Sequence, residues 1–278
     1  MKKKLVIALI LTAILLFIVW VFWANSAVEL NAVTVVRPDL PAQFHGYRIA
    51  HVSDLHSASF WPDVIGVLKD AAPDIICVTG DLMDVRDQNC DTALSFMAEA
   101  AAIAPCYYIT GNHEVRLPEA LYDQLMEGLE RAGVIILQDR TVLLEQAGSV
   151  ISITGHFWGD TSDVGELTDH DGFRILLSHQ SEDMENYAAG NFDLVLSGHA
   201  HGGQFRLPFV GGVYAPGQGF FPQYDTGAYT LGHTDMVVSR GIGNSTIPLR
   251  FNNRPEVVLV VLERENNEEL RSEMYDHT

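Results

Sequence analysis

Cysteine is scarce in this chain of 278 residues. The three cysteines, Cys77, Cys90 and Cys106, lack the CxxC spacing of a zinc knuckle, and an odd number does not suit a disulfide framework. We therefore expect buried or neutral thiols. A single bridge between Cys90 and Cys106 is the alternative that the sequence leaves open.

Basic residues are also few, since 17 lysines and arginines stand against 36 aspartates and glutamates and give a formal charge of −19. Such a surface does not attract the phosphate backbone of nucleic acid or the head groups of anionic lipids. The sequence therefore predicts no nucleic-acid partner, and only the N-terminal lysines suit an anionic membrane.

Charge is missing altogether from residues 5–23, where Thr12 is the only polar residue. At a rise of ~1.5 Å per residue, this run spans roughly 28 Å, which is close to the thickness of a bilayer core. Trp20 and Trp23 lie at its far end, where aromatic belts form at membrane surfaces.

Three lysines precede this apolar run, and basic flanks stay in the cytoplasm. We therefore expect residues 1–24 to be a single-pass anchor in the cell membrane, with a cytoplasmic N-terminus and an extracytoplasmic main domain. The alternative is a signal peptide cleaved at small residues within 24–27.

The first half of the remaining chain alternates apolar runs with segments of helical spacing. Residues 25–44 read as a connector that includes an edge strand at 33–36. The elements predicted after it are strands at 48–53, 74–79 and 106–110, and helices over 62–72, from Asp91, and from Pro118 to Gly133. This alternation predicts right-handed βαβ units and a parallel sheet.

The pattern changes after Gly133, because short strands separated by polar turns suggest antiparallel additions. The segments predicted there are strands at 134–137, 141–144 and 150–154, a loop over 156–172, strands at 174–177 and 193–196, an irregular stretch over 202–233 rich in glycine, proline and aromatics, strands at 236–239 and 256–262 that close the sheet, and a solvated tail over 263–278.

Metal-type side chains come at the ends of most of these strands. The residues so placed are Asp54, Asp81, Asn112, His179 and His199. In α/β sheets, ligands bind beyond the carboxyl ends of the strands. Residues i and i+2 of extended backbone point the same way, so His56 can act with Asp54, and His201 with His199.

A cluster of aspartate, histidine and asparagine suits a pair of divalent metal ions. Asp81 is a good candidate to bridge two ions about 3.5–4 Å apart, because it has two carboxylate oxygens. Two divalent cations outweigh the carboxylates of Asp54 and Asp81, which leaves the pocket at about +2. Such a pocket favours an anionic phosphate.

The ligands occur in a fixed series of motifs. In chain order they are Asp54-Leu55-His56, Gly80-Asp81, Gly111-Asn112-His113-Glu114, Ser178-His179 and Gly198-His199-Ala200-His201. The series resembles the pattern of the calcineurin-like metallophosphoesterase superfamily (DxH, GD, GNH with D or E, H, and GHxH) and departs from it at no ligand. The resemblance covers residues 45–262, which we expect to form the metallophosphoesterase domain.

The resemblance implies an α/β fold: a four-layer αββα sandwich of two mixed sheets flanked by helices, preceded here by the transmembrane helix. Residues 198–204 and 250–256 are similar to the branch of small membrane-linked phosphohydrolases. Some members of that branch resemble the enzymes that cleave the pyrophosphate of UDP-2,3-diacylglucosamine.

The resemblance also implies roles for the individual residues. One metal takes Asp54, His56, Asp81 and His201, and the other takes Asp81, Asn112, His179 and His199. A hydroxide that bridges the metals attacks phosphorus in line, and His113 donates a proton to the leaving oxygen. Ligands of these types accept manganese, iron or zinc.

The expected function is therefore hydrolysis of a phosphodiester or pyrophosphate bond, in a small-molecule or lipid substrate that is lipid-linked or nucleotide-linked. One alternative is a phosphomonoesterase or protein phosphatase. Another, of a different class, is a non-catalytic membrane-tethered scaffold that keeps the metals for structure. A missing ligand or a missing His113 would favour the scaffold, and neither is missing.

Several further residues have two interpretations. Arg116, Arg240 and Arg254 could grip a phosphate or form ordinary surface ion pairs. His51 is expected to be hydrogen-bonded core, whereas His156 could reach the pocket. The aromatic residues of the irregular stretch could line an apolar wall for a lipid or base, or the loop could pack on itself; they are Phe205, Phe209, Phe220, Phe221 and Tyr224.

Overall fold

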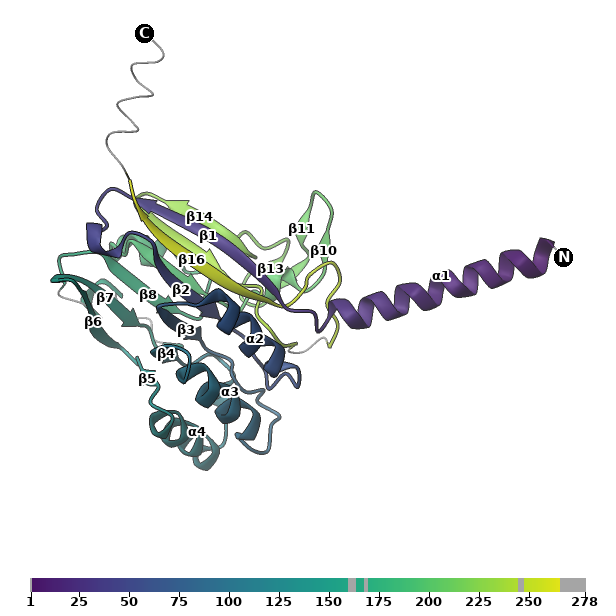
Figure 1. Cartoon of the computed structure of the whole chain (residues 1–278), viewed down its shortest axis with the longest axis horizontal. Helices are drawn as coiled ribbons and strands as arrows, with labels where there is room; N and C mark the ends of the chain where they lie inside the picture. The colour runs from purple at the N-terminus through teal and green to yellow at the C-terminus, as the bar shows by residue number, and fades with distance from the viewer. Residues whose placement is uncertain (1, 160–163, 168–169, 245–247, 266–278) are drawn as a thin grey trace, which may run out of the picture.

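The structure, a computed structural model, describes residues 2–159, 164–167, 170–244 and 248–265. Most of the tail expected over 263–278 lies outside the described residues, and Glu263 and Arg264 belong to the last strand. Two large sheets face one another, and a long N-terminal helix extends away from them (Figure 1).

The first sheet is mixed and has the strand order β1-β16-β2-β3-β4-β5. Its strands are β1 (Glu29–Arg37), β2 (Tyr47–Val52), β3 (Ile75–Thr79), β4 (Cys106–Ile109), β5 (Ile135–Ile136) and β16 (Glu256–Arg264). β2 to β5 run parallel, whereas β16 is antiparallel to β2 and parallel to the edge strand β1. The predicted parallel sheet is thus confirmed for the first half of the chain.

The second sheet is also mixed and has the order β14-β15-β9-β8-β7-β6. Its strands are β6 (Arg140–Gln146), β7 (Ser149–Gly155), β8 (Arg174–Ser178), β9 (Leu194–Ser197), β14 (Gly227–Leu231) and β15 (Thr234–Val238). The outer pairs β6–β7 and β14–β15 are antiparallel, and the strands between them are parallel.

Every residue of β3 is buried, as expected for a continuous apolar strand covered on both faces. One face of the first sheet packs on the second sheet through an apolar core. That core includes Ile49, Ile75, Ile109, Ile153, Ile175, Leu196 and Val260. Burying a side chain of this kind contributes ~1.5–3 kcal/mol.

Helices cover the two outer faces. α2 (Trp61–Ala71), α3 (Asp91–Ala101) and α4 (Glu119–Arg131) pack on the first sheet through residues such as Leu68, Phe96 and Leu125. The second sheet is covered by α5 (Met184–Ala189) and the short helix η3 (Val164–Leu167), which share a core with Leu176, Val195 and Met236. The four-layer αββα arrangement is confirmed.

Three expectations about the strands were wrong. β5 is parallel to β4 rather than an antiparallel addition, because α4 is a crossover that returns the chain to the same edge. β15 and β16 do not close one sheet, since each belongs to a different one. The stretch expected to be irregular contains the strand β14. It was not predicted because its alternation of side chains is short and none of them is buried.

The N-terminal helix α1 (Lys2–Ala24) is long and apolar enough to cross a membrane, and its apolar side chains are exposed rather than packed on the rest of the chain. Cys77, Cys90 and Cys106 are buried free thiols, so the bridge between Cys90 and Cys106 does not form. Burial raises the pKa of the Cys106 thiol to about 12, which keeps it neutral.

Candidate metal centre

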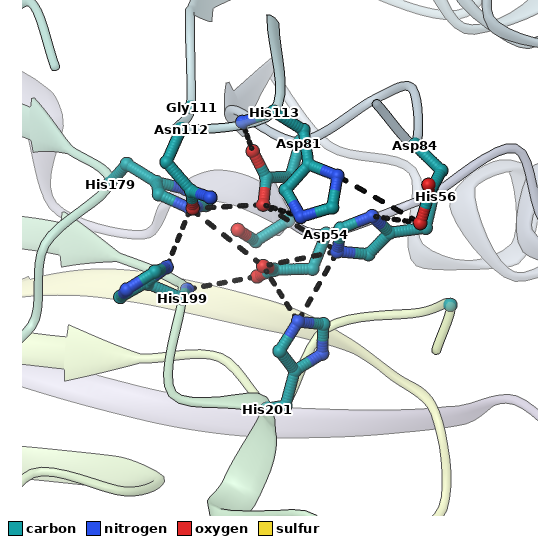
Figure 2. A network of polar contacts seen from close by, with 12 residues as sticks. Asp54, His56, Asp81, Asp84, Gly111, Asn112, His113, His179, His199 and His201 are labelled. Atoms are coloured by element: carbon teal, nitrogen blue, oxygen red, sulfur yellow. Dashed lines mark hydrogen bonds and ion pairs between the residues drawn. The ribbon is translucent and has the colours of Figure 1, made fainter. Parts of the chain in front are cut away.

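All seven predicted metal ligands lie where strands of the two sheets end. Asp54 and His56 follow β2, Asp81 follows β3, and Asn112 follows β4, and these strands are neighbours in the first sheet. His179 follows β8, and His199 and His201 follow β9, which is next to β8 in the second sheet. Figure 2 shows the side chains converging around Asp54 and Asp81.

The backbone at these strand ends is strained. Five of the ligands are non-glycine residues with positive φ: Asp54 (53°), His56 (43°), Asp81 (53°), His199 (67°) and His201 (48°). Each such residue costs of order 1–3 kcal/mol, and clusters of them occur at functional sites. The fold keeps these conformations because they turn the side chains into one pocket.

Two glycines allow the loops after β3 and β4 to touch. A Cβ atom on Gly111 would lie 2.2 Å from Oδ1 of Asp81, and one on Gly80 would lie 2.5 Å from the Gly111 nitrogen. A side chain on Gly111 would displace the Asp81 carboxylate, and one on Gly80 would collide with the backbone of the loop after β4. This explains why glycine precedes Asp81 and Asn112 in the sequence.

One half of the cluster is formed by Asp54, His56 and His201. Nε2 of His201 lies 3.4 Å from Oδ1 of Asp54 and 3.2 Å from Nε2 of His56. Oδ1 of Asp54 is fully buried and accepts no hydrogen bond from the described residues. A buried carboxylate oxygen without a donor is costly, and a cation shared with the two histidines would satisfy it.

The other half is formed by Asn112, His179 and His199. Nε2 of His179 lies 3.2 Å from Oδ1 of Asn112 and 3.2 Å from Nδ1 of His199. If hydrogen bonds alone decided the orientation, the oxygen and nitrogen of the Asn112 amide would be exchanged, so that the nitrogen donates to Asp81 and His199. The orientation with oxygen inward is the one that a metal ligand needs, because only the oxygen has a free lone pair.

Asp81 lies between the two halves. Its Oδ2 is 3.5 Å from Nε2 of His56 and 3.3 Å from Nε2 of His179. Its Oδ1 accepts a hydrogen bond from the backbone N–H of His113 at 2.8 Å. Burial opposes ionisation of this carboxyl, but His179 and His56 outweigh burial and hold the pKa of Asp81 well below its usual range. One carboxylate thus faces both groups of donors.

Metal binding requires neutral histidine rings, a condition that His199 and His201 meet without a metal. Burial lowers the pKa of His199 to about 4 and that of His201 to about 3. For His179, burial also lowers the pKa, but Asp81 and Asp54 outweigh it and raise the value to about 10. The carboxylates of Asp54 and Asp81 therefore stabilise a positive charge at His179, and either a proton on the ring or a bound metal ion can supply that charge. The residues present can hold divalent metals.

His113 lies at the edge of the cluster, with 10% of its side chain exposed. Its Nδ1 accepts the Val85 N–H at 3.0 Å, so the neutral ring carries its proton on Nε2. That Nε2 lies 4.0 Å from Oδ2 of Asp81. Oδ2 of Asp84 lies 3.8 Å from Nδ1. Asp84 was not among the predicted site residues, although its place three residues after Asp81 on the same loop is a usable signal.

Glu114 is fully buried and binds backbone rather than His113. Its carboxylate accepts the N–H groups of Asp81, Met83 and Gly111 at 2.8–3.0 Å. Burial, together with the nearby Asp81, raises the pKa of Glu114 to about 7. Glu114 therefore fixes the loops after β3 and β4 to one another and sets where Asp81 lies.

Glu114→Ala is expected to lower the free energy of unfolding by roughly 3 kcal/mol or more, because each buried N–H left without an acceptor costs about 1–3 kcal/mol. The midpoint of chemical unfolding of the full chain in detergent measures this. Glu130→Ala, an exposed position on α4, serves as the matched control. Equal midpoints for the two variants would contradict the role assigned to Glu114.

Trp158 and Arg250 also belong to the surroundings of the cluster, and neither was among the predicted site residues. The Trp158 ring lies 4.9 Å from that of His199 and 5.3 Å from that of His179. Arg250 is buried, with Nη2 3.3 Å from Nδ1 of His201. Trp158 lies in no motif, whereas Arg250 opens the stretch 250–256, for which the sequence predicted no role at the metal centre.

The remaining sequence candidates have more ordinary surroundings. Arg254 forms an ion pair with Glu29, as the alternative to phosphate binding predicted, whereas Arg240 pairs with both Glu29 and the buried Glu256. Arg116 is exposed and donates to the Asn112 carbonyl at 2.7 Å, which leaves it beside the cluster. His51 is buried, with Nε2 2.8 Å from Oγ1 of Thr79, so its assignment as hydrogen-bonded core is confirmed.

This constellation can be compared with known proteins. A model of the family described as calcineurin-like phosphoesterase matches residues 47–203, from β2 to the last metal motif. The chain belongs to this family. It is therefore a metallophosphoesterase, an enzyme that hydrolyses phosphoric esters with the help of metal ions, as the motifs predicted.

Curated relatives agree with this assignment. The metallophosphoesterase is 30% identical to the uncharacterized metallophosphoesterase YkuE of Bacillus subtilis over 86% of this chain and 87% of that protein. It is 29% identical to phosphodiesterase YaeI of Escherichia coli over 78% of this chain and 82% of that protein. It is 27% identical to a transmembrane protein with a metallophosphoesterase domain from Danio rerio, over 94% of this chain and 63% of that protein.

Proposed function

We propose that this metallophosphoesterase hydrolyses a phosphodiester or pyrophosphate bond with two divalent metal ions. The observation that carries the proposal is the position of Asp81, whose Oδ2 faces His56 on one side and His179 on the other. A carboxylate shared between two sets of donors is the arrangement that a two-metal site requires.

The ligand sets follow from the two halves of the cluster. We assign Asp54, His56, Asp81 and His201 to one ion, and Asp81, Asn112, His179 and His199 to the other. Manganese, iron and zinc all suit this combination of donors. When bound, the two ions supply a hydroxide nucleophile and stabilise the negative charge that gathers on the phosphoryl oxygens.

His113 is proposed to supply the proton for the leaving oxygen. Its Nδ1 is occupied by the Val85 N–H, so Nε2 is the nitrogen that presents a proton toward the pocket. The ring is held in place by packing on His56, with ring centroids 4.5 Å apart. We place His113 outside the two ligand sets, although its ring lies close enough to His56 and Asp81 for the three to hold an ion together.

The substrate is proposed to be lipid-linked or nucleotide-linked, and similarity to UDP-2,3-diacylglucosamine pyrophosphatase stays a prediction. The name of the YaeI relative favours a diester over a monoester. We further propose that residues 1–24 anchor the enzyme in the cell membrane, with residues 45–262 as the extracytoplasmic domain. Residues 25–44 connect them and contribute β1, which pairs along its whole length with β16.

The test is turnover of bis-p-nitrophenyl phosphate by the full chain in detergent. Removing metals with EDTA is expected to abolish turnover, and adding Mn²⁺ is expected to restore it with about two ions bound per chain. Turnover that survives complete metal removal would contradict the proposal. Faster hydrolysis of p-nitrophenyl phosphate than of the diester would point instead to a phosphomonoesterase.

A further inference from the structure

Residues 205–224 form a small lobe of two hairpins. The hairpins are β10 (Arg206–Leu207) with β11 (Gly211–Gly212), and β12 (Tyr214–Ala215) with β13 (Gly219–Phe220). Of the aromatic residues noted in the sequence, Tyr224 is buried in the core, whereas Phe209, Phe220 and Phe221 are 109%, 73% and 64% exposed. Phe220 contacts the Tyr214 ring of the same lobe, with centroids 5.5 Å apart, but Phe209, Phe220 and Phe221 still present most of their surface outward.

The backbone at two of these residues is unusual. Phe209 and Phe221 have φ values of 66° and 57°, in the left-handed region where glycine is normal and a bulky residue is an outlier. Leu207 and Val210 beside them are also exposed. Such backbone conformations are costly and cluster at functional sites, which indicates that the exposed aromatic side chains have a function on the surface of the lobe.

The lobe lies where α1 meets the domain. The Arg206 N–H donates to the Phe251 carbonyl at 2.9 Å, and the Phe251 ring contacts the Trp20 ring of α1 edge-on at 6.1 Å. Figure 1 shows β10, β11 and β13 at the end of the domain from which α1 departs. The apolar surface of the helix is thus joined to the lobe through Phe251.

The end of α1 is fixed to the domain rather than loosely tethered. Asn25 accepts the Arg250 N–H at 2.6 Å and donates to the Arg250 carbonyl at 3.0 Å. The Arg254 guanidinium lies over the Trp23 ring at 4.8 Å. Arg250 also contacts His201, so one loop joins the helix end to the metal centre.

The charge of the lobe differs from that of the chain. Residues 205–224 contain no acidic residue and one basic residue, Arg206, whose charge is paired with Asp225 at 2.7 Å. A lobe of this kind is not repelled by lipid head groups, although the chain as a whole carries −19. Exposed aromatic and aliphatic side chains on a neutral surface suit the boundary between head groups and acyl chains.

We propose that the lobe inserts into the surface of the same phospholipid bilayer that α1 spans. Two contacts, the helix and the lobe, then hold the metal centre facing the membrane, where it meets phosphates carried on lipids. This inference rests on the proposed membrane anchoring of α1, and it names a phospholipid surface as the occupant of the exposed apolar patch.

The test uses full chain reconstituted in vesicles of phosphatidylcholine and phosphatidylglycerol. Phe221→Cys is labelled with an environment-sensitive fluorophore, and Phe209→Cys is a second lobe position; the native cysteines are buried and stay unlabelled. Leu143→Cys is the matched control, because Leu143 is 61% exposed on β6, at the opposite edge of the second sheet from β14. We expect the lobe label alone to emit at shorter wavelength and to be quenched at least severalfold by brominated lipid.

Each outcome decides the proposal. Equal emission and quenching at lobe and control positions, in protein that floats with the vesicles, would overturn it. A shorter wavelength without quenching by brominated lipid would mean that a second copy of the chain covers the lobe, which also overturns it. Protein that does not float would refute the anchoring and the inference together. Turnover of soluble bis-p-nitrophenyl phosphate by the same samples reports on the hydrolase separately.

Discussion

Asp81→Asn is expected to reduce kcat by roughly 10³-fold or more, which corresponds to about 4 kcal/mol of lost transition-state stabilisation. Asparagine keeps the shape of the side chain but removes the charge and one of two oxygen ligands. Oδ2 of Asp81 faces both His56 and His179, so both halves of the metal centre lose their common ligand. Metal content measured on the purified variant is expected to fall along with activity.

The matched control for this variant is Asp70→Asn. Asp70 is exposed on α2, and the substitution makes the same chemical change away from the cluster. The control is expected to keep its metals and its turnover of bis-p-nitrophenyl phosphate. An Asp81→Asn enzyme that binds metals and turns over substrate at the rate of the control would rule out the bridging role.

The ligands could be predicted from sequence because each follows a local signal. A run such as 74–79 reads as a buried strand, and a glycine and an aspartate end it. Parallel strands place their carboxyl ends at one sheet edge, so proximity within β2, β3 and β4 followed from topology. His179 and His199 also follow strands, but the resemblance alone indicated that these strands belong to a second sheet, because no local pattern specifies how two sheets face one another.

The features that sequence analysis missed depend on long-range packing. Arg250 reaches His201 across 49 positions of the chain, and Trp158 reaches His199 from a loop without periodicity. The pairing of β1 with β16 joins the two ends of the domain, and two apolar strands do not encode which partner they choose. The sequence also left open whether Phe221 lines an apolar wall or packs within its loop, because an aromatic side chain suits both surroundings.

His113→Gln is expected to lower kcat by about 10²- to 10⁴-fold, the usual contribution of a positioned general acid. The two ligand sets do not include His113, so metal content is expected to stay at that of the unmodified enzyme. His233→Gln, at an exposed position, is the matched control and is expected to keep full activity. Parallel loss of metal and activity in His113→Gln would mean that His113 is a ligand instead.

The leaving group separates proton donation from a role in binding. p-Nitrophenolate is a weak base that departs without much help, whereas an alkoxide needs a proton as the bond to phosphorus breaks. If Nε2 of His113 supplies that proton, the loss on His113→Gln is larger for an alkyl ester than for bis-p-nitrophenyl phosphate. The Val85 N–H on Nδ1 makes Nε2 the atom that can do this. An equal loss for both substrates would show that His113 positions the phosphate rather than protonating the leaving oxygen.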